Sequence, residues 1–346
     1  MTRNAVILFN LGGPDSLEAV RPFLFNLFND RAIIGAPAPM RWLLARYISG
    51  RRAPIARTIY AEMGGQSPLL EGTRAQAAAL EARLGEDWKT FIAMRYWHPR
   101  AAQVVRAAKA WRPDRVILLP LYPQYSVTTT GSSVSEWNRE ARAIGLAVPT
   151  AVVCCYPTAP GWIEALAALT RTGLAEARAK GRPRLLLSAH GLPKSVIASG
   201  DPYQAQVERT AAALVAAIGE AELDWTVCYQ SRVGRQEWIG PSTEDELKRA
   251  GRDGVPVVVV PIAFVSEHSE TLVELDIEYR RLAGDHGVPW YVRVPTVTTD
   301  PRFIEALAEL AQAARIEDEP GPGHDHGARS CPTECIRCPT HRSSSR

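Results

Sequence analysis

The sequence, 346 residues long, lacks the features that mark several special classes of protein. No apolar run approaches the roughly 18 residues that a membrane-spanning helix needs. The start, from Met1 to Phe9, is too short and too abrupt for a signal peptide and is typical of a first strand. We therefore expect a cytoplasmic protein that at most touches a membrane surface. The formal net charge is only +3, which argues neither for nor against a nucleic-acid partner.

Cysteine is also scarce, since the chain has six. In a cytosolic protein of this size they indicate thiols or metal ligands rather than the disulfide framework of a small secreted domain. Hydrophobic residues make up 46% of the chain and charged residues 22%, which is ordinary for a folded globular protein and excludes a disordered or fibrous one. The length predicts two domains of about 150 residues each.

Eight short apolar segments are typical of buried strands, and helix-patterned stretches separate nearly all of them. The strands are expected at 5–10, 89–95, 115–119, 150–155, 184–188, 225–229, 257–261 and 290–294, with helical patterns such as 71–84, 162–179 and 204–218. This alternation predicts parallel sheets covered on both faces. We expect an α/β protein with two similar Rossmann-like domains, 1–155 and 156–299, each with a four-stranded parallel sheet, then a helix at 300–315 and a tail at 316–346.

The two halves of the chain share short segments. Residues 7–14 resemble 186–193 at an offset of 179, and residues 119–122 resemble 260–263 at an offset of 141. The first half therefore carries about 38 extra residues, which we place between Val20 and Arg57. This apolar lip, 21–57, mixes large apolar residues with arginines, a composition typical of an interfacial segment or of a lid over an apolar acidic ligand. An ordinary amphipathic helical hairpin packed on its own domain is the alternative.

One histidine stands where a predicted strand breaks into a turn. His190 lies in residues 188–193 (SAHGLP), directly after the apolar run 184–187. Because ligands of open α/β sheets bind outside the carboxyl ends of the strands, His190 is a candidate site residue. The alternative, equally compatible with its position, is a histidine packed in the turn.

Acidic residues are dense after the strand 257–261. Ser266 is a natural N-cap for the helix that follows, and carboxylates then recur every three or four residues, at Glu267, Glu270, Glu274 and Glu278. Like charges at this spacing repel, so the row is either a solvated face or a path for protons or divalent cations. The strand before His190 and the strand before Glu267 end at the same sheet edge. An imidazole and a carboxylate there could accept protons or bind a divalent metal weakly.

The strand ends of the first half carry aromatic and cationic groups, among them Arg95, Tyr96 and Tyr122, and Leu11 occupies the repeat position of His190. A flat, aromatic, anionic ligand between the domains would satisfy this set. Segments along the chain up to about residue 315 also resemble the motifs of the ferrochelatase family. They are 8–14 (LFNLGGP), 64–69 (GGQSPL), 122–126 (YPQYS), 188–193 (SAHGLP), 200–203 (GDPY), 229–234 (YQSRVG), 238–241 (WIGP) and 267–272 (EHSETL).

The resemblance implies a lyase of the chelatase fold that inserts ferrous iron into protoporphyrin IX in a cleft between two domains, as a monomer or homodimer without nucleic acid. It implies that His190 and Glu270 are the catalytic pair and bind the iron, with Glu267, His268 and Glu274 in an acidic path. It also implies that the lip covers the pocket and can rest on the inner membrane. The implied porphyrin-pocket residues are Leu11, Arg52, Tyr60, Arg95, Tyr96, Tyr122, Ser231 and Trp238.

The tail resembles the C-terminal extension of ferrochelatases that hold a [2Fe-2S] cluster on three terminal cysteines and one internal cysteine. Cys331, Cys335 and Cys338 match the three, although their spacing differs. The internal ligand position of the animal enzymes falls on Val127, so Cys154 or Cys155 is the expected fourth ligand, ahead of Cys228. A zinc site completed by His324, His326 or His341 and a tail of unliganded thiols are the alternatives.

Three other functions stay open at this point. The chain could metallate coproporphyrin instead, or it could be a cobalt or nickel chelatase for another tetrapyrrole. It could also be a two-domain heme- or metal-binding protein without catalysis, although such a protein would not need the pair of His190 and Glu270.

Overall fold

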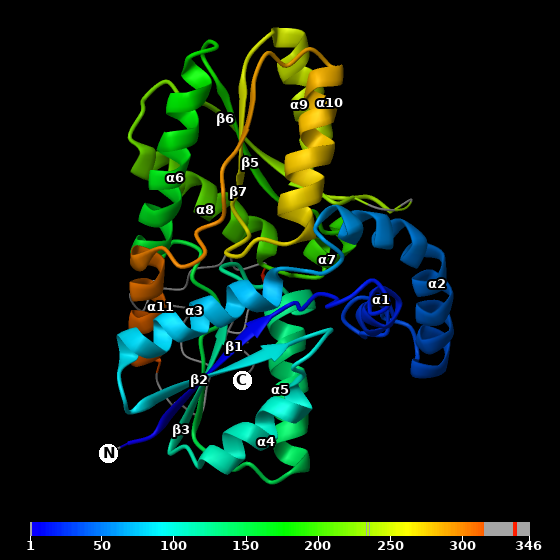
Figure 1. Cartoon of the computed structure of the whole chain (residues 1–346), viewed down its shortest axis with the longest axis vertical. Helices are drawn as coiled ribbons and strands as arrows, with labels where there is room; N and C mark the ends of the chain where they lie inside the picture. Colours follow the sequence, from blue (N-terminus) through cyan, green and yellow to red (C-terminus); the bar gives the residue numbers. More distant parts are fainter. Residues whose placement is uncertain (1, 233, 235, 315–334, 338–346) are drawn as a thin grey trace. The chain divides into compact units, whose positions relative to one another are not determined.

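The computed structural model describes residues 2–232, 234, 236–314 and 335–337 (Figure 1). The chain folds into two compact units, which we describe separately. Unit 1 comprises, so far as they are described, Met1–Tyr122, Ser126–Cys154 and Ala308–Gly321. Unit 2 comprises Pro123–Tyr125, Cys155–Leu307 and the described part of Pro322–Arg346. None of the helices in the described ranges is long and apolar enough to cross a membrane.

Unit 1 holds a four-stranded parallel sheet in the order β2-β1-β3-β4. Its elements are β1 (Asn4–Asn10), α1 (Val20–Phe28), α2 (Ala38–Glu62), α3 (Leu69–Leu84), β2 (Trp88–Met94), α4 (Ala101–Trp111), β3 (Arg115–Pro120), the π-helix η1 (Val127–Gly131), α5 (Ser132–Ala143) and β4 (Thr150–Val152). All seven residues of the central strand β1 are buried, because helices cover both faces of the sheet. Residues of α4 and α5, among them Val105 and Trp137, form one of these covers.

Unit 2 repeats this topology in the order β6-β5-β7-β8. Its elements are α6 (Pro160–Arg178), β5 (Arg184–His190), α7 (Lys194–Ala198), α8 (Tyr203–Ile218), β6 (Asp224–Gln230), α9 (Thr243–Asp253), β7 (Val257–Pro261), the π-helix η2 (Glu270–Glu278), α10 (Tyr279–Asp285) and β8 (Tyr291–Arg293). The last helix, α11 (Pro301–Ala313), begins in unit 2, and its residues from Ala308 onward belong to unit 1. Figure 1 shows α6 and α8 on one face of this sheet and α9 and α10 on the other. The prediction of two similar Rossmann-like halves with four-stranded parallel sheets is confirmed.

All eight expected strands are present, with small differences at their ends. The last strand of each sheet is shorter than expected: β4 stops at Val152 and β8 at Arg293, because each is an edge strand that pairs with one neighbour over three residues. By contrast, β5 runs further than expected and includes His190, which is in register with Gln230 of β6. The prediction that His190 lies just beyond its strand was therefore wrong by a few residues.

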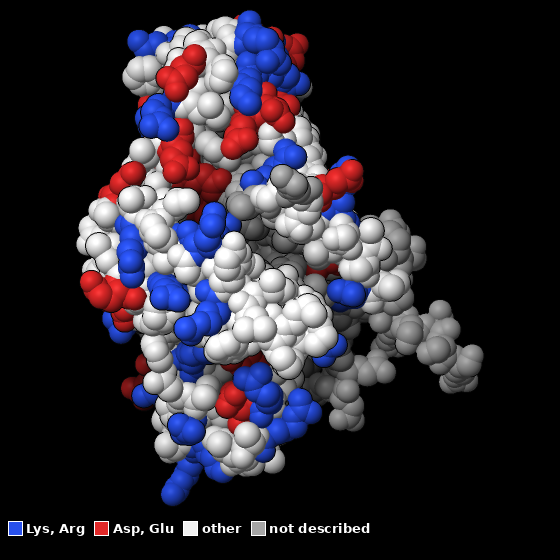
Figure 2. Space-filling view, turned by 90° about the vertical axis from the view of Figure 1, so that its right-hand side faces the viewer, with Lys and Arg blue, Asp and Glu red and all other residues white. Residues whose placement is uncertain are grey.

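The extra residues of the first half form two helices, α1 and α2, which pack against each other beside the sheet of unit 1 (Figure 1). The inner face of α2 carries small residues such as Ala45, Ser49 and Ala53, which are buried. Its outer face is unusual, because large apolar side chains are 38–67% exposed there: Met40, Trp42, Leu43, Leu44, Tyr47 and Ile55. Figure 2 views the molecule from the side on which α2 lies in Figure 1 and shows a broad uncharged area edged by basic residues.

Candidate active site

The candidate site of unit 2 is built at the carboxyl ends of its central strands. His190 is the last residue of β5, and Gln230 and Ser231 lie at the end of the neighbouring strand β6. The π-helix η2, which follows the third strand β7, brings Glu270 and Glu274 to the same edge. The expected meeting of an imidazole with carboxylates at one sheet edge is thus what the fold of unit 2 produces.

His190 and Glu270 form a direct pair. The Nδ1 atom of His190 lies 2.8 Å from Oε2 of Glu270, and the two side chains are 40% and 21% exposed. Although burial disfavours the imidazolium, the Glu270 carboxylate raises the pKa of His190 above its usual value. Burial would in turn raise the pKa of Glu270, but the charge and hydrogen bond of His190 hold that pKa well below its usual value. The Glu270 carboxylate therefore stabilises the imidazolium whenever His190 takes up a proton.

Three further groups hold the Glu270 carboxylate in place. The Nε2 atom of His268 lies 3.8 Å from Oε1, and the Ser231 hydroxyl lies 3.2 Å from Oε2. The Gln230 amide donates to Oε2 at 3.4 Å, and its own oxygen accepts a hydrogen bond from the buried hydroxyl of Ser188 at 2.7 Å. Because an ionised carboxylate only accepts hydrogen bonds, Gln230 must present its NH₂ group to Glu270, which leaves its oxygen for the Ser188 hydroxyl.

Glu274 is the second carboxylate of the site and shares Ser231 with the first. The Ser231 backbone N–H donates to Glu274 Oε1 at 2.8 Å, its hydroxyl lies 2.5 Å from Oε2, and the Tyr279 hydroxyl donates to Oε1 at 3.1 Å. Burial, followed by the charge of Glu270, raises the pKa of Glu274 to about 7. A single serine hydrogen cannot satisfy two carboxylates, so a proton held by Glu274 completes the hydrogen bonding.

The acidic row departs from the expected single helix face. The helix begins at Glu270 with Ser269 as its N-cap, so the predicted N-cap at Ser266 was wrong. It is also a π-helix, whose wider turns do not keep residues three or four apart on one face. Glu267 precedes it and forms an ion pair of 2.7 Å with Arg293 of β8, and Glu278 is exposed at the other end. Of the four carboxylates, only Glu270 and Glu274 face each other across Ser231.

The remaining residues of the expected pocket lie on both units. In unit 1, Leu11 and Tyr60 belong to an apolar cluster around α1 and α2, Tyr96 is fully buried in that cluster, and Arg52 is exposed on α2. The Tyr122 hydroxyl is buried without a hydrogen-bond partner among the described residues. In unit 2, the ring of Trp238 lies over Gly191, where an added Cβ would come within 3.5 Å of it.

Some of these neighbours were not anticipated from the sequence. Gln230 and Arg293 hold site carboxylates, and in unit 1 Arg95 binds Asp30 and Glu136. Gln230 stood inside a quoted motif beside Ser231, so its position was a usable signal. The two ion-pair networks join residues that are 26 to 65 positions apart, and no local pattern reveals such pairs.

The cysteines expected in the tail are only partly described. Cys331 and Cys338 lie outside the described residues, whereas Cys335 is buried and packs against Ala205 of α8. The neighbouring residue Gln206 donates from its side-chain amide to Sγ of Cys155 at 3.4 Å. Within the ranges that the structure describes, no group of three or more histidine, cysteine or acidic side chains is arranged to hold a metal ion.

Most of the chain matches a known family. Residues 3–315 match the family model described as Ferrochelatase. The chain is 55% identical over 312 residues to the ferrochelatase of a Wolbachia strain from Drosophila simulans, covering 89% of this chain and 98% of that one. It is 51% identical over 346 residues to the ferrochelatase of Caulobacter vibrioides, covering 99% and 98% of the two chains.

Solved structures support the fold. The sirohydrochlorin chelatase SirB from Bacillus subtilis subspecies spizizenii, in complex with cobalt, superposes with a TM-score of 0.52. The match covers 90% of this chain and 94% of that chain at 11% sequence identity. At this identity the likeness shows that the two chains share a two-domain fold.

Proposed function

The chain belongs to the ferrochelatase family, and on that premise we propose that it inserts ferrous iron into protoporphyrin IX to give protoheme, the last step of heme synthesis. The observation that carries the proposal is the pair of His190 and Glu270, 2.8 Å apart at the end of a buried strand. A second carboxylate, Glu274, stands beside the pair with a pKa raised to about 7.

The proposed reaction exchanges two protons for one metal ion. Two pyrrole N–H groups of the porphyrin lose their protons, Fe²⁺ binds the four nitrogens, and both protons leave for solvent. His190 in its neutral form accepts a pyrrole proton, and the neighbouring Glu270 carboxylate stabilises the imidazolium that results. Glu274 can take up and release a proton near neutral pH, so it connects the pair to solvent.

The same side chains also suit the incoming metal. An imidazole and a carboxylate form a weak site with open positions, which favours transfer of ferrous iron over storage. We propose His190 and Glu270 as its ligands and His268 and Glu274 as the path beside them. Glu267 belongs to this path only indirectly, because Arg293 neutralises its charge.

We propose that the porphyrin is held by groups from both units. Apolar and aromatic side chains contact the ring, and the cationic and hydroxyl groups serve its propionates or the pocket wall. The proposed set is Leu11, Arg52, Tyr60, Arg95, Tyr96, Tyr122, Ser231 and Trp238.

The outer face of the lip supports a proposed peripheral contact with the cytoplasmic face of the membrane. Large side chains such as Trp42, Leu43 and Tyr47 are exposed on α2. Exposed arginines flank them, including Arg51 and Arg52. Apolar surface with basic flanks is the composition that binds anionic lipid.

We also propose a [2Fe-2S] cluster on Cys331, Cys335 and Cys338, with Cys155 as the fourth ligand in preference to Cys154. The proposal is supported by two contacts at adjacent residues of α8: Cys335 packs against Ala205, and the Gln206 amide donates to Sγ of Cys155. Soft thiolate ligands suit an iron–sulfur cluster, which would tie the tail to unit 2.

Replacement of His190 tests the proposed chemistry. The His190→Ala variant is expected to lose insertion of iron or zinc while it still binds porphyrin, because the base is removed and the pocket wall is kept. Insertion rates measured by absorption, with porphyrin binding measured by fluorescence quenching, check both parts. Near-normal turnover in this variant would overturn the assignment. Rates with protoporphyrin and coproporphyrin, compared in the parent protein, separate the two porphyrin substrates.

A further inference from the structure

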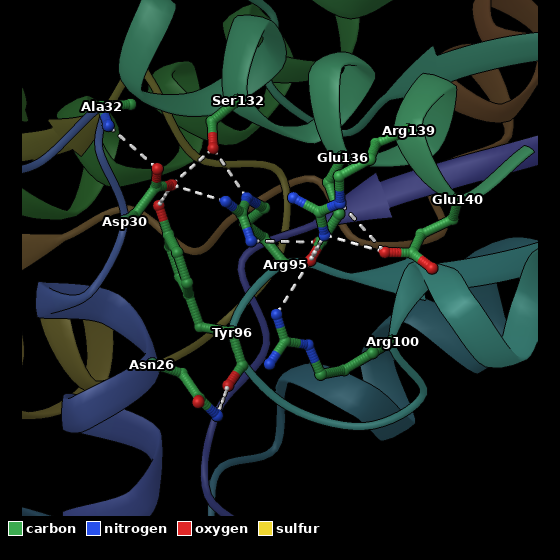
Figure 3. A network of polar contacts seen from close by, with 10 residues as sticks. All are labelled: Asn26, Asp30, Ala32, Arg95, Tyr96, Arg100, Ser132, Glu136, Arg139 and Glu140. Carbon is green, nitrogen blue, oxygen red and sulfur yellow. Dashed lines mark hydrogen bonds and ion pairs between the residues drawn. The ribbon is translucent and has the colours of Figure 1, made fainter. Parts of the chain in front are cut away.

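Asp30 lies at the root of the lip, in the short segment between α1 and α2, and its side chain is 7% exposed. Its carboxylate accepts four hydrogen bonds (Figure 3). Oδ2 accepts from Arg95 Nη2 at 2.8 Å, from the Tyr96 hydroxyl at 2.8 Å and from the Ser132 hydroxyl at 2.5 Å. Oδ1 accepts from the backbone N–H of Ala32 at 2.9 Å. Asp30 therefore joins the lip to the residues that follow β2 and to the start of α5.

Each of the three nitrogens of the Arg95 guanidinium donates a hydrogen bond in this network. Nη2 binds Asp30, Nη1 donates to Glu136 at 3.0 Å, and Nε donates to the Ser132 hydroxyl at 2.6 Å. Glu136 also accepts from Arg100 at 2.8 Å and from Arg139 at 3.4 Å, so three arginines share this carboxylate (Figure 3). All three nitrogens of Arg95 are engaged and its side chain is only 11% exposed. Turning the Arg95 guanidinium away from this network would break a buried ion pair, so its orientation is fixed.

Tyr96, beside Arg95, contacts both helices of the lip. Its backbone oxygen accepts from the Asn26 amide of α1 at 3.0 Å, and its ring packs among apolar side chains of α1 and α2. Its backbone N–H donates to the oxygen of Leu11 at 2.9 Å. Tyr96, which holds both Asp30 and α1, is thus hydrogen-bonded directly to Leu11, a residue of the proposed porphyrin pocket.

The charge on Asp30 is maintained by its partners. Burial would raise the pKa of Asp30, but Arg95 and the hydroxyls of Ser132 and Tyr96 hold that pKa below its usual value. The carboxylate is therefore ionised at neutral pH. Replacing it with a neutral group of the same shape would leave an arginine with one buried partner fewer.

We propose that Asp30 is a positioning residue for porphyrin binding: it fixes the lip to the end of β2 and holds Arg95 and Tyr96, two residues of the proposed pocket, in place. The porphyrin part of this inference rests on the proposed function. The anchoring of the lip does not, because it is visible without substrate.

Two isosteric variants distinguish an effect on the attachment of the lip from an effect on the stability of unit 1 as a whole. Asp30→Asn and Glu136→Gln each replace a carboxylate that binds Arg95, but only Asp30 belongs to the lip. Limited digestion with trypsin, without porphyrin, measures how readily the lip detaches. Arg51 and Arg52 lie inside α2, so trypsin can cleave after them only when this helix unfolds or leaves its place. Fluorescence quenching then gives the porphyrin Kd, and steady-state assays give kcat and KM.

Asp30→Asn is expected to speed cleavage of the lip and to weaken porphyrin binding by about tenfold each, the loss of roughly one charge-assisted hydrogen bond. Its kcat at saturating porphyrin should stay within about threefold, since the chemistry is on unit 2. Tyr96→Phe, a milder change that keeps the ring, is expected to act in the same direction with smaller size. Glu136→Gln is expected to lower the Tm and to leave the cleavage rate of the lip as in the parent.

Two results would overturn the inference. One is a lower Tm for Asp30→Asn with unchanged lip cleavage and unchanged porphyrin Kd. The other is equal acceleration of cleavage by Glu136→Gln, which would make the network a general support of unit 1. If the parent itself binds no porphyrin, the proposed function fails, while the proteolysis comparison still tests the anchor.

Discussion

Replacement of Glu274 by glutamine should change the pH dependence of stability. The pKa of Glu274 is raised from 4.5 to about 7 in the folded protein, chiefly by burial and by the charge of Glu270. The folded state therefore binds more protons than the unfolded state between these pH values, and stability must fall as the pH rises through this window. Between pH 5 and pH 8 the parent loses about 2.5 kcal/mol from this one group.

Glutamine has nearly the same shape as glutamate but carries no charge at any of these pH values. Its oxygen can still accept from the Ser231 N–H and the Tyr279 hydroxyl, so the main change is loss of the titration. Urea unfolding of parent and variant at pH 5 and pH 8 measures the effect. We expect the variant to gain about 2.5 kcal/mol relative to the parent on going from pH 5 to pH 8.

A matched change on the same helix provides the control. Glu278 is exposed at the end of η2, so Glu278→Gln should alter stability by less than about 0.5 kcal/mol at either pH. If Glu274→Gln shifts stability equally at pH 5 and pH 8, Glu274 does not titrate near neutrality. The proposed role of Glu274 as a proton carrier beside His190 would then be refuted.

Three other predictions concern the pair, the lip and the tail. Glu270→Gln should slow insertion by at least about a hundredfold and lower the pKa of His190 seen in the pH–rate profile, because the imidazolium loses its carboxylate; an unchanged rate contradicts the acidic path. Tyr47→Glu should reduce binding to anionic-lipid vesicles in a flotation assay, whereas Trp225→Glu, exposed on unit 2, should not; equal effects contradict a lip-specific contact. The freshly purified protein should show visible absorption bands that Cys331→Ser abolishes, and a colourless protein with bound zinc would refute the cluster.

Much of the fold could be predicted from the sequence because buried strands and repeats leave local sequence patterns. Buried parallel strands are short apolar runs, so the eight strands could be located to within a few residues. The internal repeat predicted that the halves share a topology, and both sheets have equivalent strand orders. The strand ends at one edge of the sheet predicted that His190 meets a carboxylate of the acidic row, and the resemblance to the family identified that carboxylate as Glu270.

What escaped prediction depends on contacts between distant residues or on subtle backbone geometry. The nine residues of η2 are too few for apolar periodicity to distinguish a π-helix from an α-helix, so the face assigned to Glu267 was wrong. Arg293, which neutralises Glu267, lies on β8, and its ion pair is set by the packing of neighbouring strands. No pattern in the sequence singles out Asp30, since its partners Arg95 and Ser132 are far along the chain.

The central claim is that this chain inserts iron into a porphyrin with His190 as the base. The most direct measurement is an anaerobic assay of the purified protein with Fe²⁺ and protoporphyrin IX, followed by the absorption of protoheme. We predict enzyme-dependent formation of protoheme that His190→Ala abolishes. Formation of protoheme no faster than in a protein-free control, under conditions where porphyrin binds, would contradict the claim.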